Sequence, residues 1–295
     1  MTRLPTVRLL HTRGASESAG LAGACGSASA PTRQTAPNAQ SQALPIAHVL
    51  GVPVHVIGGE EAIGLMEQWI EQRDGLRWIA LTGSHGVVEG YKHPQFQAIL
   101  ESAALSLPDG KWTARLAGWR GGCAPRQVRG TDLLWKCCES FSPKGYRHFF
   151  YGDTEEVLAL MTRQLRERFP ALRIAGTYSP PYRELTPNED AEIANLINAA
   201  APDVLWVGLG LPKQERWIYE HRHCLQVPVV VAVGAAFKFA SGAVKSAPPW
   251  VSDWGLEWAW RFAHEPRRLW HRVVIYGPQF VTHALLELSG LKKYE

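Results

Sequence analysis

The chain has 295 residues, of which 46% are hydrophobic, enough to fill a sizeable globular core. Its formal net charge is +4, and most of this excess lies in residues 1–44, which hold four arginines and one glutamate. The rest of the chain is nearly neutral, which argues against a nucleic-acid-binding protein, because such proteins cluster Lys and Arg on one element. The longest apolar run, residues 227–237, is about half of the ~20 residues that a membrane-spanning helix needs.

Residues 1–44 are rich in Ala, Ser, Thr, Gly, Gln and Pro, which predicts a disordered low-complexity tail. This stretch also lacks the apolar run of a secretion signal, so none is expected. The five cysteines are an odd number with no C-x-x-C spacing, so we expect reduced thiols, with neither a disulfide framework nor a zinc site.

Residues 45–249 alternate short apolar runs with helical patterns, such as the one over residues 155–169. Strands are predicted at residues 52–57, 77–82, 104–108, 147–152, 172–177, 203–208 and 227–234. This alternation predicts an α/β fold, with a Rossmann-like, mostly parallel sheet and helices on both faces. The runs at 203–208 and 227–234 are apolar at nearly every position, as expected of central strands.

Residues 250–295 form a different pattern, a helical appendage dense in Trp and Arg, with breaks expected at Pro266 and around Gly277 and Pro278. Its arginines include Arg261, Arg268 and Arg272, interleaved with tryptophans. Such a pattern is usually a solvated face over an aromatic core. The same mixture also suits an amphipathic surface at the lipid headgroup level.

The stretch VGLGLPKQERW follows a predicted buried strand and opens a helix. Gly208 and Gly210 lie at the strand end, and Lys213 and Gln214 fall in the first helical turn. Free N–H groups at a helix start favour an anion such as a diphosphate. A tight turn with no ligand is an equally good interpretation of the glycine pair alone. A nicotinamide site is disfavoured, because the third glycine of that fingerprint is missing.

Other polar residues follow two more predicted strands. Asp109 ends one strand in a P-D-G turn, and Thr82, Ser84 and His85 follow another. Aspartate in such a turn more often only supports the turn, whereas beside a sugar site it could act as a general base. In RGTDLL, Thr131 or Asp132 is expected to cap the following helix.

Four motifs in order, VGLGLPKQERW, VGAAFKFASG, APPWVSDWGLEWAWR and EPRRLWHR, resemble the WecG/TagA/CpsF glycosyltransferase family over roughly residues 49–276. Upstream, TGSHGVVEG, LPDG, RGTDLL and RHFFYG also look like segments of exopolysaccharide-type members. The resemblance implies inverting transfer from a UDP-activated sugar to a polyprenyl-diphosphate-linked sugar, at the cytoplasmic face of the cell membrane, by a peripheral enzyme.

The resemblance also assigns roles to residues. Asp109 matches the proposed base, Thr82 and Gln214 match active-site polar positions, and the turn from Gly208 to Gln214 faces the nucleotide. The C-terminal arginines Arg261, Arg268 and Arg272 are expected to meet phosphate. No cofactor and no metal are expected, because the sequence has no D-x-D pair and the leaving-group charge must be met by helix dipoles and cations.

Two positions depart from the family pattern. Lys238 takes the place of the aspartate in the common F-D pair, and Ser246 takes the place of the arginine in the common R-A-P motif. We expect Lys238 to change how the nucleotide is held, because an ammonium can only donate and favours phosphate. Because of these departures, an alternative function stays open, in which the chain is a relative that binds lipid-linked sugar or a partner transferase without turnover. The donor sugar is not determined by the sequence, and the oligomeric state is open, a homo-oligomer included.

Overall fold

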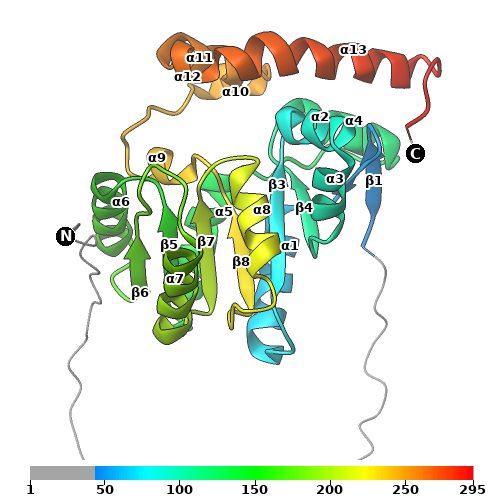
Figure 1. Cartoon of the computed structure of the whole chain (residues 1–295). Coiled ribbons are helices and arrows are strands. Elements are labelled where there is room, and N and C mark those ends of the chain that lie inside the picture. The colour runs from blue at the N-terminus through cyan, green and yellow to red at the C-terminus, as the bar shows by residue number, and fades with distance from the viewer. Residues whose placement is uncertain (1–43, 295) are drawn as a thin grey trace, which may run out of the picture.

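The computed structural model describes residues 44–294, in which a central sheet, a small hairpin and a layer of C-terminal helices are arranged as in Figure 1. Residues 1–43 and Glu295 lie outside the described residues, so the predicted disorder of the tail stays a prediction.

Six parallel strands form the central sheet in the order β4-β3-β8-β7-β5-β6. They are β3 (Arg77–Thr82), β4 (Leu105–Pro108), β5 (Arg147–Gly152), β6 (Arg173–Tyr178), β7 (Val204–Gly208) and β8 (Val229–Ala232). Every residue of β7 and β8 is buried, because these two strands are central and helices cover both sides of them. The predicted α/β fold and the two predicted central strands are confirmed.

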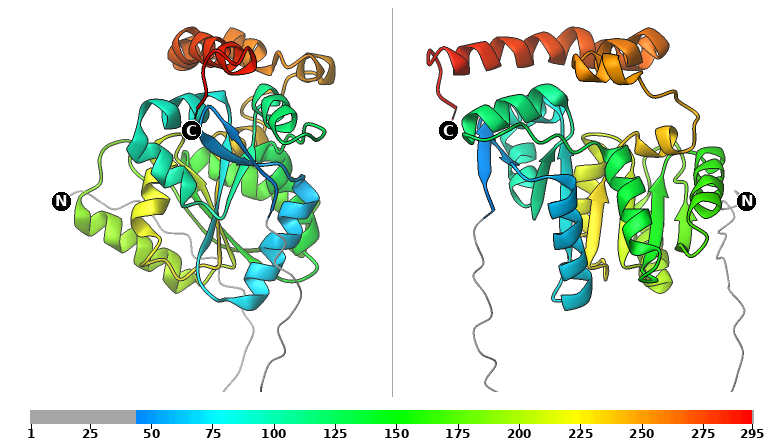
Figure 2. Two further views of the ribbon diagram at one scale, coloured as in Figure 1. Left: turned by 90° about the vertical axis from the view of Figure 1, so that its right-hand side faces the viewer. Right: turned by 180° about the vertical axis from the view of Figure 1, so that it is seen from behind.

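Helices cover both faces of the sheet (Figure 2). One face carries α1 (Gly59–Gln72), α5 (Gly130–Phe141), α6 (Glu155–Arg168) and the short α9 (Ala236–Ala240). The other carries α3 (Pro94–Glu101), α7 (Pro187–Ala200) and α8 (Lys213–His221). The expected cap of α5 by Thr131 or Asp132 is wrong, because the helix begins earlier, with Arg129 as its N-cap and no side-chain cap bond.

The first predicted strand does not join the central sheet. β2 (Val52–His55) pairs antiparallel with β1 (Ile46–Val49) through a tight turn at Leu50 and Gly51. The hairpin packs on α2 (Ser84–Lys92), α4 (Lys111–Arg120) and the C-terminal helix, forming a third hydrophobic cluster. Most of its apolar residues therefore bury against these helices, while β2 also lies beside β4, where the Ser106 N–H donates to His55 Nδ1 at 3.0 Å.

The C-terminal residues form a layer of helices across the carboxyl ends of the strands (Figures 1 and 2). This C-terminal layer consists of α10 (Pro249–Asp253), α11 (Glu257–His264), α12 (Pro266–His271), the π-helical turn η1 (Arg272–Tyr276) and α13 (Gly277–Leu288). The predicted break at Pro266 is confirmed. The break expected at Gly277 and Pro278 is wrong, because the wider π turn carries the chain into α13 and accommodates the missing N–H of the proline.

Candidate active site

A cavity of ≈ 340 Å³ lies between the carboxyl ends of the strands and the C-terminal layer. This volume falls in the range of about 300–1,000 Å³ that is usual for small-molecule sites. Its lining includes Leu81, Gly83, His85, Gly86, Asp109, Gly210, Leu211, Gln214, Ala232, Val233, Gly234, Ala235, Arg261, Leu269, His271 and Arg272. Residues from four strand ends thus form the floor, and α11 to η1 form the roof. Asp109 and the turn at Gly210 therefore line the same cavity.

Asp109 follows β4 directly and is held in place by its neighbours on both sides. Its N–H donates to the carbonyl of Thr82 at 3.2 Å, and its Oδ1 accepts from the N–H of Gly130 at 3.1 Å. Gly130 is the first residue of α5, so the carboxylate caps the positive end of that helix. Burial raises the pKa of Asp109, while the Gly130 N–H and the cations Arg272 and Arg261 oppose that rise. A carboxylate with a raised pKa is better suited to accept a proton as a general base.

Gln214 ties two glycine turns together from the first turn of α8. Its Oε1 accepts from the N–H of Gly210 at 3.1 Å and from the N–H of Gly234 at 2.9 Å. Its Nε2 donates to Oε1 of Glu215 at 2.8 Å. The amide therefore fixes the β7–α8 and β8–α9 loops relative to each other, so that both border the cavity.

Glu215 is a member of this network that the sequence reasoning missed. Its side chain is 1% exposed, and Oε2 has no hydrogen-bond partner. Burial raises the pKa of Glu215 to about 7, although the Gln214 amide favours the carboxylate. A glutamate beside a glutamine in a first helical turn looks solvated in the sequence, so only the packing around α8 reveals it.

The roof of the cavity is cationic. Arg261 comes from α11, and His271 and Arg272 come from the junction of α12 with η1. His85, at the start of α2, faces them from below, and burial together with the nearby Arg272 and His271 lowers its pKa to about 4. The His85 imidazole thus lies near the Arg272 guanidinium group, and Arg272 and Arg261 both line the cavity, where cations favour an anionic ligand.

Two glycines that the sequence reasoning did not select shape the floor. A Cβ on Gly83 would lie 3.7 Å from Nη2 of Arg272 and 4.0 Å from Oδ2 of Asp109, so this glycine lies next to both the cation and the carboxylate. A Cβ on Gly130 would approach Leu81 Cδ1 to 2.9 Å and the carbonyl of Val233 to 3.1 Å. Only glycine lets α5 begin close enough to bond the Asp109 carboxylate.

Six of the twelve predicted site residues line the cavity, five do not, and the side chain of the twelfth, Arg268, lies outside the described part of the chain. The six are His85, Asp109, Gly210, Gln214, Arg261 and Arg272. Thr82 is 1% exposed, with Oγ1 at 2.8 Å from Oγ of Ser106. Ser84 and Lys213 begin α2 and α8 beside the cavity without lining it.

The remaining predicted residues are Gly208 in β7, Lys238 in α9 and Arg268 in the C-terminal layer. Gly208 packs under Phe237, where a Cβ would come within 2.6 Å of the ring. Lys238 Nζ lies 4.0 Å from Oδ1 of Asp153, so its charge faces a carboxylate on the β5–α6 loop. Arg268 belongs to α12, but its side chain lies outside the described part of the chain. The roles assigned to these residues stay predictions.

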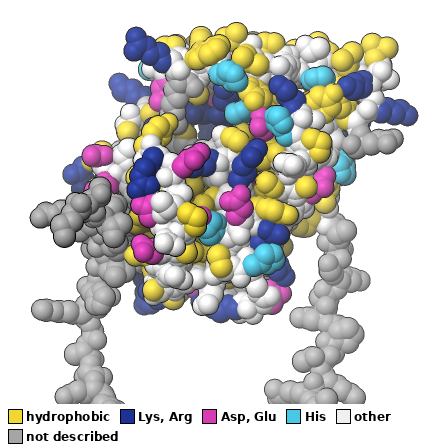
Figure 3. Space-filling model, viewed as in Figure 1, with side chains coloured by type: hydrophobic (Ala, Val, Ile, Leu, Met, Phe, Trp, Pro, Cys, Tyr) yellow, Lys and Arg dark blue, Asp and Glu magenta, His cyan; other side chains and the backbone are white. Residues whose placement is uncertain are grey.

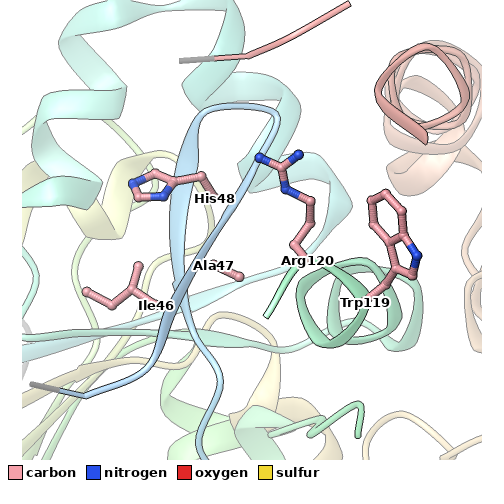
Figure 4. A pocket seen from close by; sticks show the side chains of 5 residues that line it. All are labelled: Ile46, Ala47, His48, Trp119 and Arg120. Atoms are coloured by element: carbon pink, nitrogen blue, oxygen red, sulfur yellow. The ribbon is translucent and has the colours of Figure 1, made fainter. Parts of the chain in front are cut away.

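A second hollow of ≈ 370 Å³ lies between β1 and the end of α4, where Trp119 and Arg120 project beside the strand (Figure 4). Ile46, Ala47 and His48 form its other side, and none of the predicted site residues contributes to it. Arg120 Nη1 is 3.7 Å from Oε1 of Glu287 in α13, so the arginine also helps to hold the C-terminal layer.

The outer side of the C-terminal layer carries apolar side chains (Figure 3). The exposed apolar residues of the C-terminal layer include Trp250, Trp254, Trp258, Trp270, Val281 and Leu285, of which Trp254 is 73% exposed. Over residues 44–294, the helices are all too short or too polar to cross a membrane. Within the same residues, the His, Cys, Asp and Glu side chains form no group of three or more that could hold a metal ion.

Comparison with known proteins places this site in a family. The model of the glycosyl transferase WecG/TagA/CpsF family matches residues 47–294. A relative from Bacillus spizizenii is 34% identical over 197 residues, covering 67% of this chain and 74% of its own length. A Bacillus subtilis relative is 27% identical over 78% of this chain and 87% of its own, and one from Staphylococcus aureus is 25% identical over 60% and 68%.

All three relatives are named N-acetylglucosaminyldiphosphoundecaprenol N-acetyl-beta-D-mannosaminyltransferase. The family match spans the hairpin, the central sheet and the C-terminal layer, and therefore every residue that lines the cavity. The chain belongs to the WecG/TagA/CpsF family and is a glycosyltransferase.

Proposed function

We propose that this enzyme transfers a sugar from a UDP-sugar to a saccharide linked to polyprenyl diphosphate, with inversion and without a metal. One observation carries the proposal. The Asp109 carboxylate and the guanidinium groups of Arg261 and Arg272 line one cavity at the carboxyl end of the sheet. The names of the relatives support an acceptor in which a sugar is joined to undecaprenyl diphosphate.

Asp109 is the general base of this mechanism. It takes the proton of the acceptor hydroxyl while that oxygen attacks the anomeric carbon of the donor sugar. The bond from that carbon to the UDP oxygen breaks in the same step, and the electron pair leaves with UDP. A single displacement of this kind inverts the anomeric carbon, because the acceptor enters on the face opposite the leaving group.

Arg261 and Arg272 stabilise the charge that develops on the departing diphosphate. Cations fixed in a partly desolvated site stabilise developing charge without having to reorganise during the reaction. The glycine turns at Gly210 and Gly234, held by Gln214, border the same space and present backbone close to the ligand. We assign the nucleotide to this side of the cavity and the acceptor sugar to the side of Asp109.

The acceptor explains the exposed apolar face of the C-terminal layer. A polyprenyl chain keeps its diphosphate at the membrane surface, so the enzyme must work there. Tryptophans and leucines beside arginines suit the headgroup region of a bilayer. We propose peripheral attachment through this layer, which would hold Arg261 and Arg272 next to the lipid diphosphate. A homo-oligomer stays a prediction.

The test compares Asp109→Asn with Asp132→Asn, using a panel of UDP-sugars and a short-chain prenyl-diphosphate-linked N-acetylglucosamine. Asp132 is a matched control, because it is an exposed carboxylate on the neighbouring helix, paired with Arg129 at 2.8 Å. General-base assistance is worth about 10²–10⁴-fold, so turnover of Asp109→Asn should fall at least a hundredfold while UDP binding by calorimetry stays within a few-fold.

Two results would contradict the mechanism. Turnover of Asp109→Asn equal to that of the wild type would remove Asp109 as the base. Loss of wild-type activity on addition of a chelator, restored by a divalent cation, would show that a metal takes part. Absence of transfer from every UDP-sugar in the panel would instead favour a relative that binds lipid-linked sugar without turnover.

A further inference from the structure

The π turn η1 connects the roof of the cavity with α2. Arg272, its first residue, lines the cavity, and Tyr276, its last residue, contacts α2. π turns are rare and are frequently found at functional sites. Within five residues, this turn therefore brings Arg272 to the cavity and Tyr276 into contact with α2.

Tyr276 is held on three sides. Its hydroxyl donates to Oε2 of Glu89 at 2.8 Å, and its ring packs edge-on against His85 with centroids 4.2 Å apart. Lys92 Nζ lies 5.4 Å from the ring centroid. Glu89 is only 7% exposed, so the bond joins a hydroxyl to a buried carboxylate and is stronger than one between neutral groups.

The helix that Tyr276 contacts also borders the floor of the cavity. α2 begins at Ser84, directly after Gly83, and Glu89 lies on the second turn of that helix. Gly83 is the position at which a Cβ would approach both Arg272 Nη2 and Asp109 Oδ2 within 4.0 Å. A short helix thus connects the Tyr276 contact to the glycine that lies next to both Arg272 and Asp109.

The other end of the roof has separate anchors. Trp112 Nε1 donates to the carbonyl of Gly255 at 3.2 Å, and Lys111 Nζ donates to the carbonyl of Asp253 at 2.7 Å. These bonds fix the loop between α10 and α11, which leads to Arg261. They lie far along the chain from Arg272, whose end of the roof is anchored by Tyr276 and by the packing of α13.

We propose that Tyr276 is a positioning residue for sugar transfer, which sets Arg272 over Asp109 through its hydrogen bond to Glu89. This inference rests on the proposed function, because it assigns Arg272 to the departing diphosphate. Without the hydroxyl the π turn can move on α2, and the guanidinium group loses its fixed distance from the reacting atoms. A displacement of about 1 Å at such a group can lower turnover by about a hundredfold.

The first test is Tyr276→Phe, which keeps the ring on His85 and removes only the hydroxyl. We expect kcat to fall at least tenfold, with KM for the UDP-sugar within threefold of the wild type. Glu89→Gln should stay within threefold of wild-type kcat, because its amide oxygen still accepts from Tyr276, whereas Glu89→Leu should match Tyr276→Phe. Unchanged kcat for Tyr276→Phe would overturn the proposal.

The second test separates positioning from general destabilisation. In an Arg272→Ala background, Tyr276→Phe should lower kcat less than twofold further, because two residues that act through one group are not additive. A full tenfold loss in that background would show that Tyr276 does not act through Arg272. Tyr91→Phe is the matched control, because the Tyr91 hydroxyl also joins α2 to the C-terminal residues, by accepting a hydrogen bond from Lys292. Its kcat should stay within twofold of the wild type.

Hydrogen exchange of the substrate-free protein supplies a readout that needs no activity. Backbone amides of α12 and η1 should exchange at least tenfold faster in Tyr276→Phe, and at the wild-type rate in Tyr91→Phe. Faster exchange in a protein that transfers no sugar would support the anchor and reject the proposed function. Unchanged exchange in an active enzyme would overturn the anchor and leave the proposed function intact.

Discussion

The buried carboxyl of Glu215 gives a prediction about stability that depends on pH. Its side chain is 1% exposed and bonds Gln214, which in turn holds the two glycine turns of the cavity. Burial raises its pKa from 4.5 to about 7 in the folded protein. In the unfolded chain the carboxyl is in water and ionises at its usual pH.

The sign and size of the effect follow from proton linkage. Below pH 4.5 both states carry the proton, and Glu215 costs no stability. As the pH rises from 4.5 towards 7, the unfolded chain loses its proton first, and the free energy of unfolding falls. One pKa unit corresponds to about 1.4 kcal/mol, so the full loss above pH 7 is about 3 kcal/mol.

The assay is urea unfolding of the wild type and of Glu215→Gln at a series of pH values from 4.5 to 8. Glutamine keeps an oxygen that accepts from Gln214 Nε2, so the network survives. The difference in free energy of unfolding between variant and wild type should rise by about 3 kcal/mol in favour of the variant across this range. Glu220→Gln, an exposed change on the same helix, should give a difference constant within about 0.5 kcal/mol. A difference for Glu215→Gln that stays constant would refute the buried carboxyl as its source.

Two further variants test the floor of the cavity. Gly83→Ala should fold with stability within about 1 kcal/mol of the wild type, since its φ of −93° suits alanine, yet turnover should drop at least about tenfold because the methyl group would contact both Arg272 and Asp109. Steady-state kinetics and urea unfolding of this variant test the prediction, and full activity would mean that the reacting groups do not meet above Gly83. Gln214→Ala should lower the free energy of unfolding by about 2–4 kcal/mol, because two backbone N–H groups and a buried carboxyl lose their partner. Urea unfolding against the exposed Arg216→Ala measures it, and a loss below about 1 kcal/mol would mean that water replaces the amide at no cost.

Local patterns were sufficient to predict the strands of the central sheet. The run at 203–208 predicted a central strand because a parallel strand covered on both faces must be apolar throughout, and β7 is buried at every residue. The same reasoning gave Asp109 its place, since a residue after a parallel strand must lie at the ligand-binding edge of the sheet. The hairpin of β1 and β2 was missed as a unit, because an apolar run alone does not reveal which element it packs against.

What the sequence by itself determined is the α/β order of elements and a set of polar residues at strand ends, because hydrophobic periodicity is a local property. Only the tertiary structure decided which of these residues face one cavity. It buried Thr82 against Ser106, paired Lys238 with Asp153, and drew Glu215 into the network of Gln214. It also folded the C-terminal layer back, so that Arg272 came to lie beside Asp109 across more than 160 residues of chain. Contacts of that kind depend on how the layer packs on α2 and α4, and residue spacing carries no signal of it.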